Sequence, residues 1–215
     1  MSDIVVSGVP GSPFMRAVQM GLEEKRVPYR VQAMKPRESK TEAYLKKHPF
    51  GRVPLIECGN FTLYETQAIL RYIDAEFPDP PLQPRDHQAA ARMNQIIGIN
   101  DWYLFPKVVA VVVFNRIIGP TLGIPTDEAA IEAALPMART CIAELDRLLG
   151  MARFLAGDAL SIADLMLAAQ LDFFLESPEG KSLIANTDLS RWLARMNERP
   201  SMQATLRPDF LRRAA

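Results

Sequence analysis

A run of prolines divides the chain into two parts with different sequence patterns. The segment Phe77–Asp86 (FPDPPLQPRD) holds four prolines in ten residues. Proline can neither continue a helix nor join the interior of a sheet. The sequence therefore predicts a linker at residues 79–86, with a first domain at residues 1–78 and a second at residues 87–215.

Before the linker, short β-branched runs alternate with helical patterns. Ser12 followed by Pro13 is a typical helix start, because serine caps the free N–H groups and proline needs no donor in the first turn. We expect strands at Asp3–Ser7, Tyr29–Ala33, Leu55–Glu57 and Thr62–Tyr64, and helices at Pro13–Lys25, Thr41–Lys47 and Thr66–Glu76. This βαβ-αββα order predicts an α/β domain, a small mixed sheet with helices on both faces.

After the linker, only helical periodicity is visible, so the second domain is predicted to be all-α. We expect helices at His87–Ile99, Glu128–Leu149 with a kink at Pro136, Ile162–Phe174 and Leu189–Glu198. Ser161 and Asp164 have the spacing of a capping box, with Leu160 and Leu165 placed to form the hydrophobic staple. We expect these residues to stabilise the fold rather than to bind a ligand.

Composition excludes several classes of function. The 215 residues are 48% hydrophobic, and 25 basic residues balance 25 acidic ones, so neither disorder nor a broad nucleic-acid surface is expected. No apolar run reaches the ~18 residues of a membrane span, and no signal peptide is visible. Two cysteines and two histidines predict neither a disulfide framework nor a metal site. We therefore expect a cytoplasmic protein with no membrane or nucleic-acid partner.

Three motifs together resemble the cytosolic glutathione transferase family. They are the segments PGSPFMRAV, HPFGRVPLIECGNFTLYETQAILRYI and LSIADL, and they cover both predicted domains. Serine and arginine spaced as in Ser-x-x-x-Arg are most similar to the serine-type classes (phi, theta and delta). The resemblance implies a thioredoxin-like N-terminal domain, an all-helical C-terminal domain, a homodimer, and glutathione as co-substrate without a metal.

Ser12 is the residue that the resemblance places at the reacting sulfur. A free thiol has a pKa near ~8.5, and the thiolate is the nucleophile. A hydroxyl donor and the helix N-terminus behind it can together stabilise that anion, so no general base is required. The alternative is a plain N-cap before Pro13. Arg16, one turn further on, either adds positive potential to the site or braces the sheet.

Val53 and Pro54 form the second candidate element. An X-Pro bond is the common route to a cis peptide, which would leave the Val53 backbone free to pair with an extended peptide. In the family this valine pairs with the cysteinyl unit of glutathione, and the proline is cis. A rigid turn without a ligand is the alternative.

The two charged ends of glutathione have their own candidates. Glu65 and Thr66 lie at a helix N-terminus, and the resemblance assigns this pair to the γ-glutamyl group; the alternative is an ordinary helix cap. Lys40 and Arg52 are candidates by position for the glycyl carboxylate, although lysine and arginine are more often solvated surface residues. Many phi-type members carry histidine where Ser39 stands, which predicts a different contact here.

The second substrate is predicted to be a small hydrophobic electrophile. Candidate lining residues are Phe14, Trp102, Phe105, Val109 and, less directly, Phe114, all of which could equally be core. Phe50 either inserts into a partner subunit or is buried core. Asn100 and Asp101 lie near the expected cleft without an assigned role.

The sequence therefore predicts a glutathione S-transferase that activates the glutathione thiol for attack on electrophiles, with peroxide reduction as a further reaction. Two alternatives stay open. One is a glutathione-dependent thiol–disulfide oxidoreductase, which Ser12 disfavours because omega-like relatives carry cysteine there. The other is a non-catalytic protein that binds glutathione or another ligand. The electrophile and the physiological role are not specified by the sequence.

Overall fold

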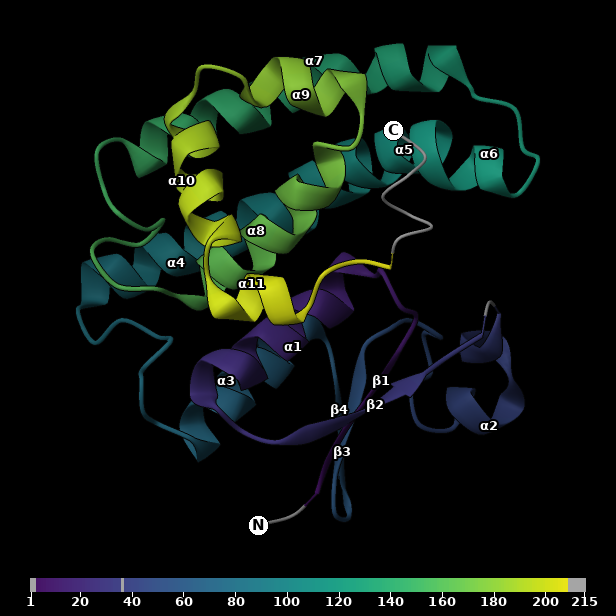
Figure 1. Ribbon diagram of the computed structural model, residues 1–215, viewed down its shortest axis with the longest axis vertical. Helices are drawn as coiled ribbons and strands as arrows, with labels where there is room; N and C mark the ends of the chain where they lie inside the picture. Colours follow the sequence, from purple (N-terminus) through teal and green to yellow (C-terminus); the bar gives the residue numbers. More distant parts are fainter. Residues whose placement is uncertain (1–2, 36, 209–215) are drawn as a thin grey trace.

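In the computed structural model, which describes residues 3–35 and 37–208, a four-stranded sheet lies beneath a group of helices (Figure 1). The predicted domain ends at residues 1–2 and 209–215 lie outside the described residues. The strands are β1 (Ile4–Gly8), β2 (Tyr29–Ala33), β3 (Leu55–Cys58) and β4 (Phe61–Tyr64). Helices of the first part are α1 (Pro13–Lys25), η1 (Glu38–Lys40), α2 (Glu42–Leu45) and α3 (Thr66–Glu76). The predicted α/β architecture, thioredoxin-like with a helical second part, is confirmed.

The sheet has the strand order β2-β1-β3-β4, with β1 parallel to β2 and the other pairs antiparallel. Its register brings three loops to one edge. Ser7 near the end of β1 pairs with Leu55 at the start of β3, and Leu55 pairs with Tyr64 at the end of β4. The chain leaving β1, the chain entering β3 and the chain leaving β4 therefore meet side by side.

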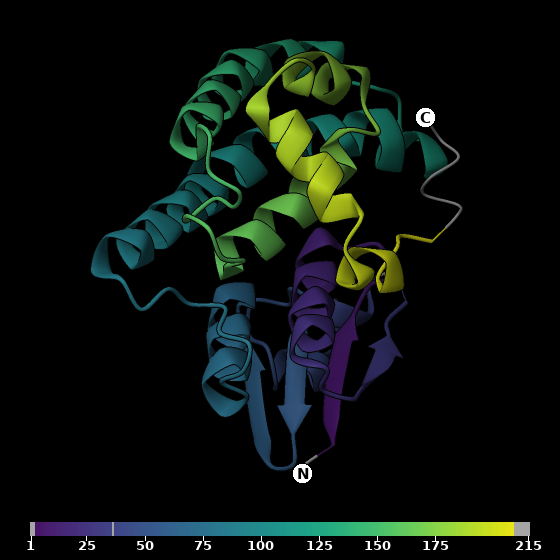
Figure 2. The ribbon, with the colours of Figure 1, turned by 60° about the vertical axis from the view of Figure 1, so that its left-hand side comes forward.

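Helix α1 belongs to two hydrophobic cores at once. Met15, Val18 and Leu22 pack with the sheet, whereas Ala17 and Met20 belong to the core of the helical part. Figures 1 and 2 both place α1 between the sheet and the helices above it. A helix apolar on two faces is buried on both, so α1 cannot shift without disturbing both cores.

The helical part begins with a continuous helix much longer than the predicted one. The segment predicted to end at Ile99 continues to Thr121 through α4 (His87–Ile99), η2 (Asn100–Val109), α5 (Ala110–Val113), η3 (Phe114–Ile118) and α6 (Gly119–Thr121). Both η2 and η3 are π-helical, and the Ala110 N–H donates to Phe105 O, five residues back. The wider π turn accommodates Pro106, which has no N–H to donate and would clash in a regular α-helix.

By length and composition alone, the helix from His87 to Thr121 could cross a membrane, which the sequence analysis did not expect. Its apolar character has a structural explanation within the fold. Ile96, Leu104 and Val112 are fully buried in the core of the helical part. Packing against the neighbouring helices therefore accounts for these apolar side chains.

The remaining helices are α7 (Glu128–Leu149), α8 (Ile162–Phe174), α9 (Pro178–Ile184), α10 (Asp188–Asn197) and α11 (Pro200–Ala204). Three of them match the predicted segments closely, and α7 continues through Pro136. The short helices α9 and α11 were not predicted, although each begins with a proline in its first turn.

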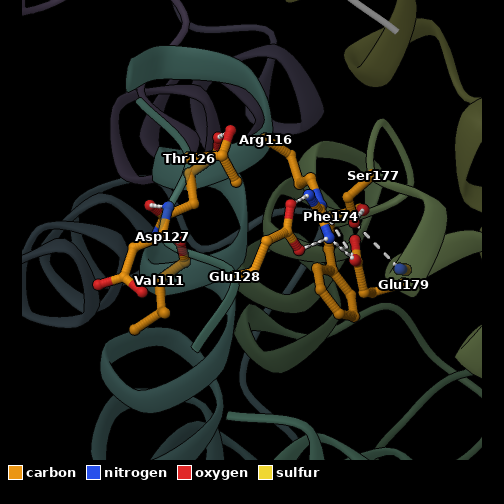
Figure 3. A network of polar contacts seen from close by, with 10 residues as sticks. Val111, Arg116, Thr126, Asp127, Glu128, Phe174, Ser177 and Glu179 are labelled. Carbon is orange, nitrogen blue, oxygen red and sulfur yellow. Dashed lines mark hydrogen bonds and ion pairs between the residues drawn. The ribbon is translucent and has the colours of Figure 1, made fainter. Parts of the chain in front are cut away.

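The loop before α7 is held to the long helix by a polar network (Figure 3). The Arg116 guanidinium lies between two carboxylates, 2.6 Å from Glu128 Oε1 and 2.6 Å from Glu179 Oε1. These carboxylates raise the pKa of Arg116. The Thr126 hydroxyl and the Asp127 N–H donate to Asn115, each at 3.0 Å. The end of the long helix is thereby joined to α7 and α9.

The linker packs against the protein at two points. Lys25 Nζ, which is fully buried, lies 2.5 Å from Asp74 Oδ1 and donates to the carbonyl of Pro80 at 2.5 Å. The Leu82 N–H donates to the same Asp74 oxygen at 2.7 Å, and the Leu82 carbonyl accepts from the Ile162 N–H at 3.0 Å. A buried ion pair whose lone pairs are otherwise satisfied is costly to break, so the linker is a structural element.

The predicted capping box at the start of α8 is confirmed, and it does more than cap. Asp164 is 0% exposed, and its carboxylate accepts hydrogen bonds from the Ser161 N–H (2.9 Å) and the Ser161 hydroxyl (2.7 Å). It also accepts from the Leu155 N–H and the Trp192 indole N–H, each at 2.9 Å. One buried side chain therefore joins α8, α10 and the loop before α8.

We predict that Asp164→Asn lowers the free energy of unfolding by about 3 kcal/mol, because the new amide N–H₂ faces donors and leaves buried groups unpaired. Chemical denaturation monitored by circular dichroism measures the change. Asp127→Asn is the matched control, since Asp127 is an exposed N-cap whose carboxylate accepts from the Ala130 N–H at 3.0 Å, and asparagine caps equally well. Equal effects of the two substitutions would contradict this assignment.

Candidate functional site

The predicted site residues gather where the three loop ends meet at the edge of the sheet. Ser12 follows β1, Val53 and Pro54 precede β3, and Glu65 with Thr66 follows β4. Because Ser7, Leu55 and Tyr64 are neighbours in register, these segments lie alongside one another. The N-terminus of α1, the extended backbone before β3 and the N-terminus of α3 are therefore neighbours at this end of the sheet.

Ser12 is the N-cap of α1 and is half-buried. Its N–H donates to Val9 O at 3.0 Å, and its Oγ accepts from the Met15 N–H at 3.4 Å. The hydroxyl proton has no acceptor among the described residues. Ser12 thus caps the helix with an oxygen lone pair while its O–H is free to donate, so capping and ligand binding are compatible.

Arg16 does not add charge to this site. Its guanidinium pairs with Asp172 of α8 and donates to Met202 O of α11 at 3.1 Å, and the side chain is nearly inaccessible. Of the two roles considered from the sequence, bracing is the one the contacts favour. The partner is the helical part rather than the sheet, so Arg16 ties α1 to the helices above it.

Val53 presents a free backbone at the entrance to β3. The Val53–Pro54 peptide bond is cis, as expected from the resemblance. Within residues 3–35 and 37–208, neither the N–H nor the carbonyl of Val53 makes a backbone hydrogen bond. The preceding carbonyl, of Arg52, is already engaged by the Tyr44 hydroxyl at 2.7 Å. Val53 can therefore pair with an added extended chain.

Glu65 has a backbone conformation that is unusual for a residue with a side chain. Its φ is 72° and its ψ is 113°, and its side chain, which is exposed, makes no capping hydrogen bond to α3. Thr66, buried, is the first residue of α3. Strain of this kind is maintained where the surrounding structure demands it, commonly at ligand sites. Because the Glu65 side chain makes no capping hydrogen bond, the first N–H groups of α3 have no side-chain cap from the described residues. They can therefore donate hydrogen bonds to a bound anion.

Asp101 and Gln67 lie near Glu65, and neither was assigned a role from the sequence. Gln67 Nε2 of α3 donates to Asp101 Oδ2 of η2 at 3.1 Å, and Asn100 Nδ2 donates to Asp101 Oδ1 at 3.0 Å. Burial raises the pKa of Asp101, and so does the nearby carboxylate of Glu65, while the two amide donors lower it. A second carboxylate beside Glu65 increases the negative potential there, which favours an ammonium group.

The two predicted cations belong to η1 and to the loop that leads into β3. Lys40 and Arg52 are both exposed, and Lys40 Nζ lies 3.4 Å from the carbonyl of Phe50. Burial lowers the pKa of His48, the charges of Lys40 and Arg52 lower it further, and the Glu65 charge raises it, so all three groups lie within electrostatic range of one ring. The site thus has charged groups of both signs, as a zwitterionic peptide requires.

The predicted apolar pocket is only partly assembled. Phe14 and Phe105 meet edge to face with ring centroids 4.4 Å apart, which joins α1 to η2. Val109 is buried in the helical core, whereas Trp102 is 74% exposed, and Phe114 is partly exposed. Phe50 is 65% exposed, so the alternative of buried core is wrong for this residue.

A separate hollow lies on the open face at the opposite end of the sheet. It is lined by Asp3, Val5, Arg30, Gln32, Glu57 and Gly59. Its charged groups are already engaged, since Arg30 pairs with Asp3 and Glu57 pairs with Lys47. Within the described residues, no group of three His, Cys, Asp or Glu side chains could hold a metal ion.

Comparison with known proteins gives the same family for both parts of the chain. Residues 6–81 match the family described as Glutathione S-transferase, N-terminal domain, and residues 104–200 match Glutathione S-transferase, C-terminal domain. Glutathione S-transferase F6 of Arabidopsis thaliana is 29% identical over 96% of this chain and 100% of its own length. Glutathione S-transferase F14 of the same plant is 30% identical over 79% of this chain and 68% of its own. The solved structure of glutathione S-transferase-I bound with the ligand lactoylglutathione superimposes with a TM-score of 0.84 at 25% identity, covering 95% of this chain and 98% of that one.

We predict that Glu65→Gly raises the free energy of unfolding by about 1 kcal/mol, because glycine adopts this backbone conformation without strain. Denaturant titration measures the change. Asn186→Gly is the matched control: Asn186 has a φ of 62°, and asparagine tolerates positive φ better than glutamate does, so the gain there should be smaller. A less stable Glu65→Gly variant would show that the Glu65 backbone is not strained.

Proposed function

The chain belongs to the glutathione S-transferase family, and from this premise we propose that it binds glutathione across the three loop ends and activates its thiol with the Ser12 hydroxyl. The observation that carries the proposal is the O–H of Ser12 at the N-terminus of α1, which has no acceptor among the described residues, near the Val53 backbone, which has no backbone partner among them. In the reaction the glutathione thiolate forms a bond to carbon of a hydrophobic electrophile, which expels its leaving group or, in conjugate addition, takes up a proton. Reduction of a peroxide to an alcohol and water, with two glutathione molecules oxidised to the disulfide, is a further reaction.

Each part of the tripeptide has a complementary group. The γ-glutamyl carboxylate fits the uncapped N–H groups of α3 and the Thr66 hydroxyl, and its ammonium fits the carboxylate of Glu65. The cysteinyl backbone pairs with the N–H and C=O of Val53, which cis-Pro54 leaves outside the strand. The glycyl carboxylate lies toward Lys40 and Arg52. Binding by backbone at the centre and by charge at both ends sets the position of the sulfur.

The energetics of thiol activation do not require a base. Lowering a thiol pKa by about 2 units from ~8.5 takes about 2.7 kcal/mol of preferential stabilisation of the anion. A hydroxyl donor to an anion contributes roughly 1.5–3 kcal/mol. The positive end of α1 adds about 0.3–1 kcal/mol. The two terms together reach the required value, and Ser12 acts as a hydrogen-bond donor and not as a nucleophile.

The second substrate enters beside the Phe14–Phe105 pair, which joins the sheet-bearing part to the long helix. Aromatic rings at this point favour a flat, hydrophobic electrophile.

Members of the family are generally dimeric, and for this chain we propose a homodimer in which exposed Phe50 contacts the partner subunit. Cytoplasmic location and a domain boundary at residues 79–86 remain part of the proposal. Both cysteines are free and buried, which is compatible with a reducing compartment.

A serine in this position favours transfer over the oxidoreductase alternative. A mixed-disulfide route needs a cysteine at the sulfur of glutathione, and both Cys58 and Cys141 are buried elsewhere, Cys58 in β3 and Cys141 in α7. Burial also raises the pKa of both thiols, which disfavours their thiolates.

We predict that Ser12→Ala lowers kcat/KM with a chloronitroarene by about a hundredfold, because one hydrogen bond to the sulfur anion is lost. Glutathione affinity should change less than threefold, since Ser12 contacts only the sulfur. Steady-state kinetics and a glutathione-binding titration measure the two quantities. Thr187→Ala removes an N-cap far from the site and should leave both unchanged. Wild-type activity in Ser12→Ala would remove Ser12 from the mechanism.

We predict that Phe105→Ala raises KM for the electrophile roughly fivefold and leaves KM for glutathione unaltered, because the Phe14 ring loses its partner. Varying each substrate in turn separates the two constants. Phe61→Ala deletes another partly exposed phenylalanine, on β4, and serves as the control. If glutathione KM changes instead, the aromatic pair belongs to the peptide site.

A further inference from the structure

Four aromatic side chains form a cluster beneath the proposed glutathione site: Tyr44, His48, Phe50 and Tyr64, hereafter the aromatic cluster. The His48 ring is at its centre. It stacks on Tyr64 with centroids 4.3 Å apart and an interplanar angle of 20°, and on Tyr44 at 6.0 Å and 26°. It meets Phe50 edge-on at 6.2 Å.

His48 is buried without the polar contacts that a buried histidine normally has. Its residue surface is 1% exposed, and its Nδ1 has no hydrogen-bond partner among the described residues. Buried polar atoms are usually paired, and an unpaired one calls for an explanation. The stacking contacts are therefore what holds this ring.

The partners of His48 lead directly to the groups that would hold glutathione. The Tyr44 hydroxyl donates to the Arg52 carbonyl at 2.7 Å, one residue before the free backbone of Val53. Tyr64 immediately precedes Glu65, the residue with the strained φ of 72°. The ring thus lies between the two segments whose separation decides whether one peptide can reach both.

Resting on the proposed function, we propose that His48 is a positioning residue: its neutral ring, stacked on Tyr44 and Tyr64, fixes the conformation of the loop that carries the Val53 backbone, against the end of β4 that the Leu55–Tyr64 pair places beside it. The ring need not touch the ligand to do so. A side chain that locks the conformation of binding groups raises affinity by reducing the ordering that binding would otherwise require.

Protonation of His48 would oppose this role. The charged form carries an N–H at Nδ1, where no described residue offers an acceptor, and it adds a cation near those of Lys40 and Arg52. Burial and these two charges lower the pKa of His48, while Glu65 raises it; burial also raises the pKa of Tyr44, so its ring carries no charge at pH 7. A lowered folded-state pKa means that the stabilising contribution is present above ~6.5 and is lost as pH falls through the folded value.

Binding and protonation are therefore linked with a definite sign. Glutathione brings two carboxylates and one ammonium, so its net negative charge by itself favours the protonated ring. Closing the segments around the ligand favours the stacked neutral ring. The positioning role predicts that this second effect is the larger, so that ligand binding lowers the pKa of His48 against the ligand's charge and acid weakens ligand binding by the same linkage.

The first test measures the dissociation constant of S-methylglutathione, whose sulfur cannot titrate. His48→Ala removes both stacks and should weaken binding roughly tenfold. His48→Phe keeps a flat ring, so it should bind within about threefold of wild type at neutral pH and retain that affinity as pH falls. His87→Ala is the control, because His87 is the other histidine and is exposed at the start of α4.

The outcomes separate the possible roles. If the His48→Phe variant binds S-methylglutathione as weakly as His48→Ala, the imidazole itself contacts the ligand. If His48→Ala has unchanged affinity, the ring has only a core role. Either result overturns the inference. Should His48→Ala not fold, His48→Phe still decides through its affinity and its pH profile. Wild-type protein that does not bind S-methylglutathione would overturn the proposed function itself.

The second test follows the two histidines by nuclear magnetic resonance as pH is varied. Saturation with S-methylglutathione should lower the pKa of His48, with the resonances of exposed His87 as the internal control. An unchanged or raised pKa at His48 would overturn the linkage, because a merely structural ring would not sense the ligand.

Discussion

The placement of α1 between two hydrophobic cores is the constraint on which the rest of the structure depends. One side of the helix packs on the sheet and another on the helical part. Polar contacts at both ends hold it in the same place: Arg16 pairs with Asp172 near its start, and Lys25 with Asp74 at its end. The first turn of α1 is therefore rigid, and its N-terminus points its free N–H groups and the Ser12 hydroxyl at one location. A catalyst that works by electrostatic preorganisation needs such a fixed donor.

The other two binding elements obtain their positions from the sheet. Register places the start of β3 and the end of β4 next to the end of β1, so three separate loops form one surface. Glu65 has a strained backbone there, and the Val53 N–H and C=O have no backbone partner among the described residues. Both features cost stability in the free protein, and both are expected where a ligand later supplies the missing contacts.

Local signals in the sequence were sufficient wherever a single element decided the outcome. Ser12–Pro13 located the start of α1, and the Ser161–Asp164 spacing identified a true capping box. The same logic applied to Ser177–Pro178 would have found α9, which was overlooked. Beyond Ile99 the prediction stopped short, because the helix continues past Pro106 through a π turn that only the packed structure reveals.

Roles that depend on tertiary contacts were beyond the sequence. Asp101 accepts a hydrogen bond from Gln67, which lies 34 positions away in the sequence. The role proposed for His48 depends on ring contacts with Tyr44 of α2 and Tyr64 of β4. The resemblance supplied Ser12, Val53 and Glu65 as candidates, and the fold brings them together. The sequence did not show in which direction the Arg16 side chain points. In the structure its guanidinium faces the helical part, where it pairs with Asp172.

The most direct measurement of the central claim is an ultraviolet titration of the glutathione thiol bound to the wild-type protein. The account predicts that the bound thiol has a pKa about 2 units below its value in free solution, so that the thiolate predominates at pH 7. A bound thiol with the same acidity as free glutathione would contradict it, because the N-terminus of α1 and the Ser12 hydroxyl would then give the anion no preferential stabilisation.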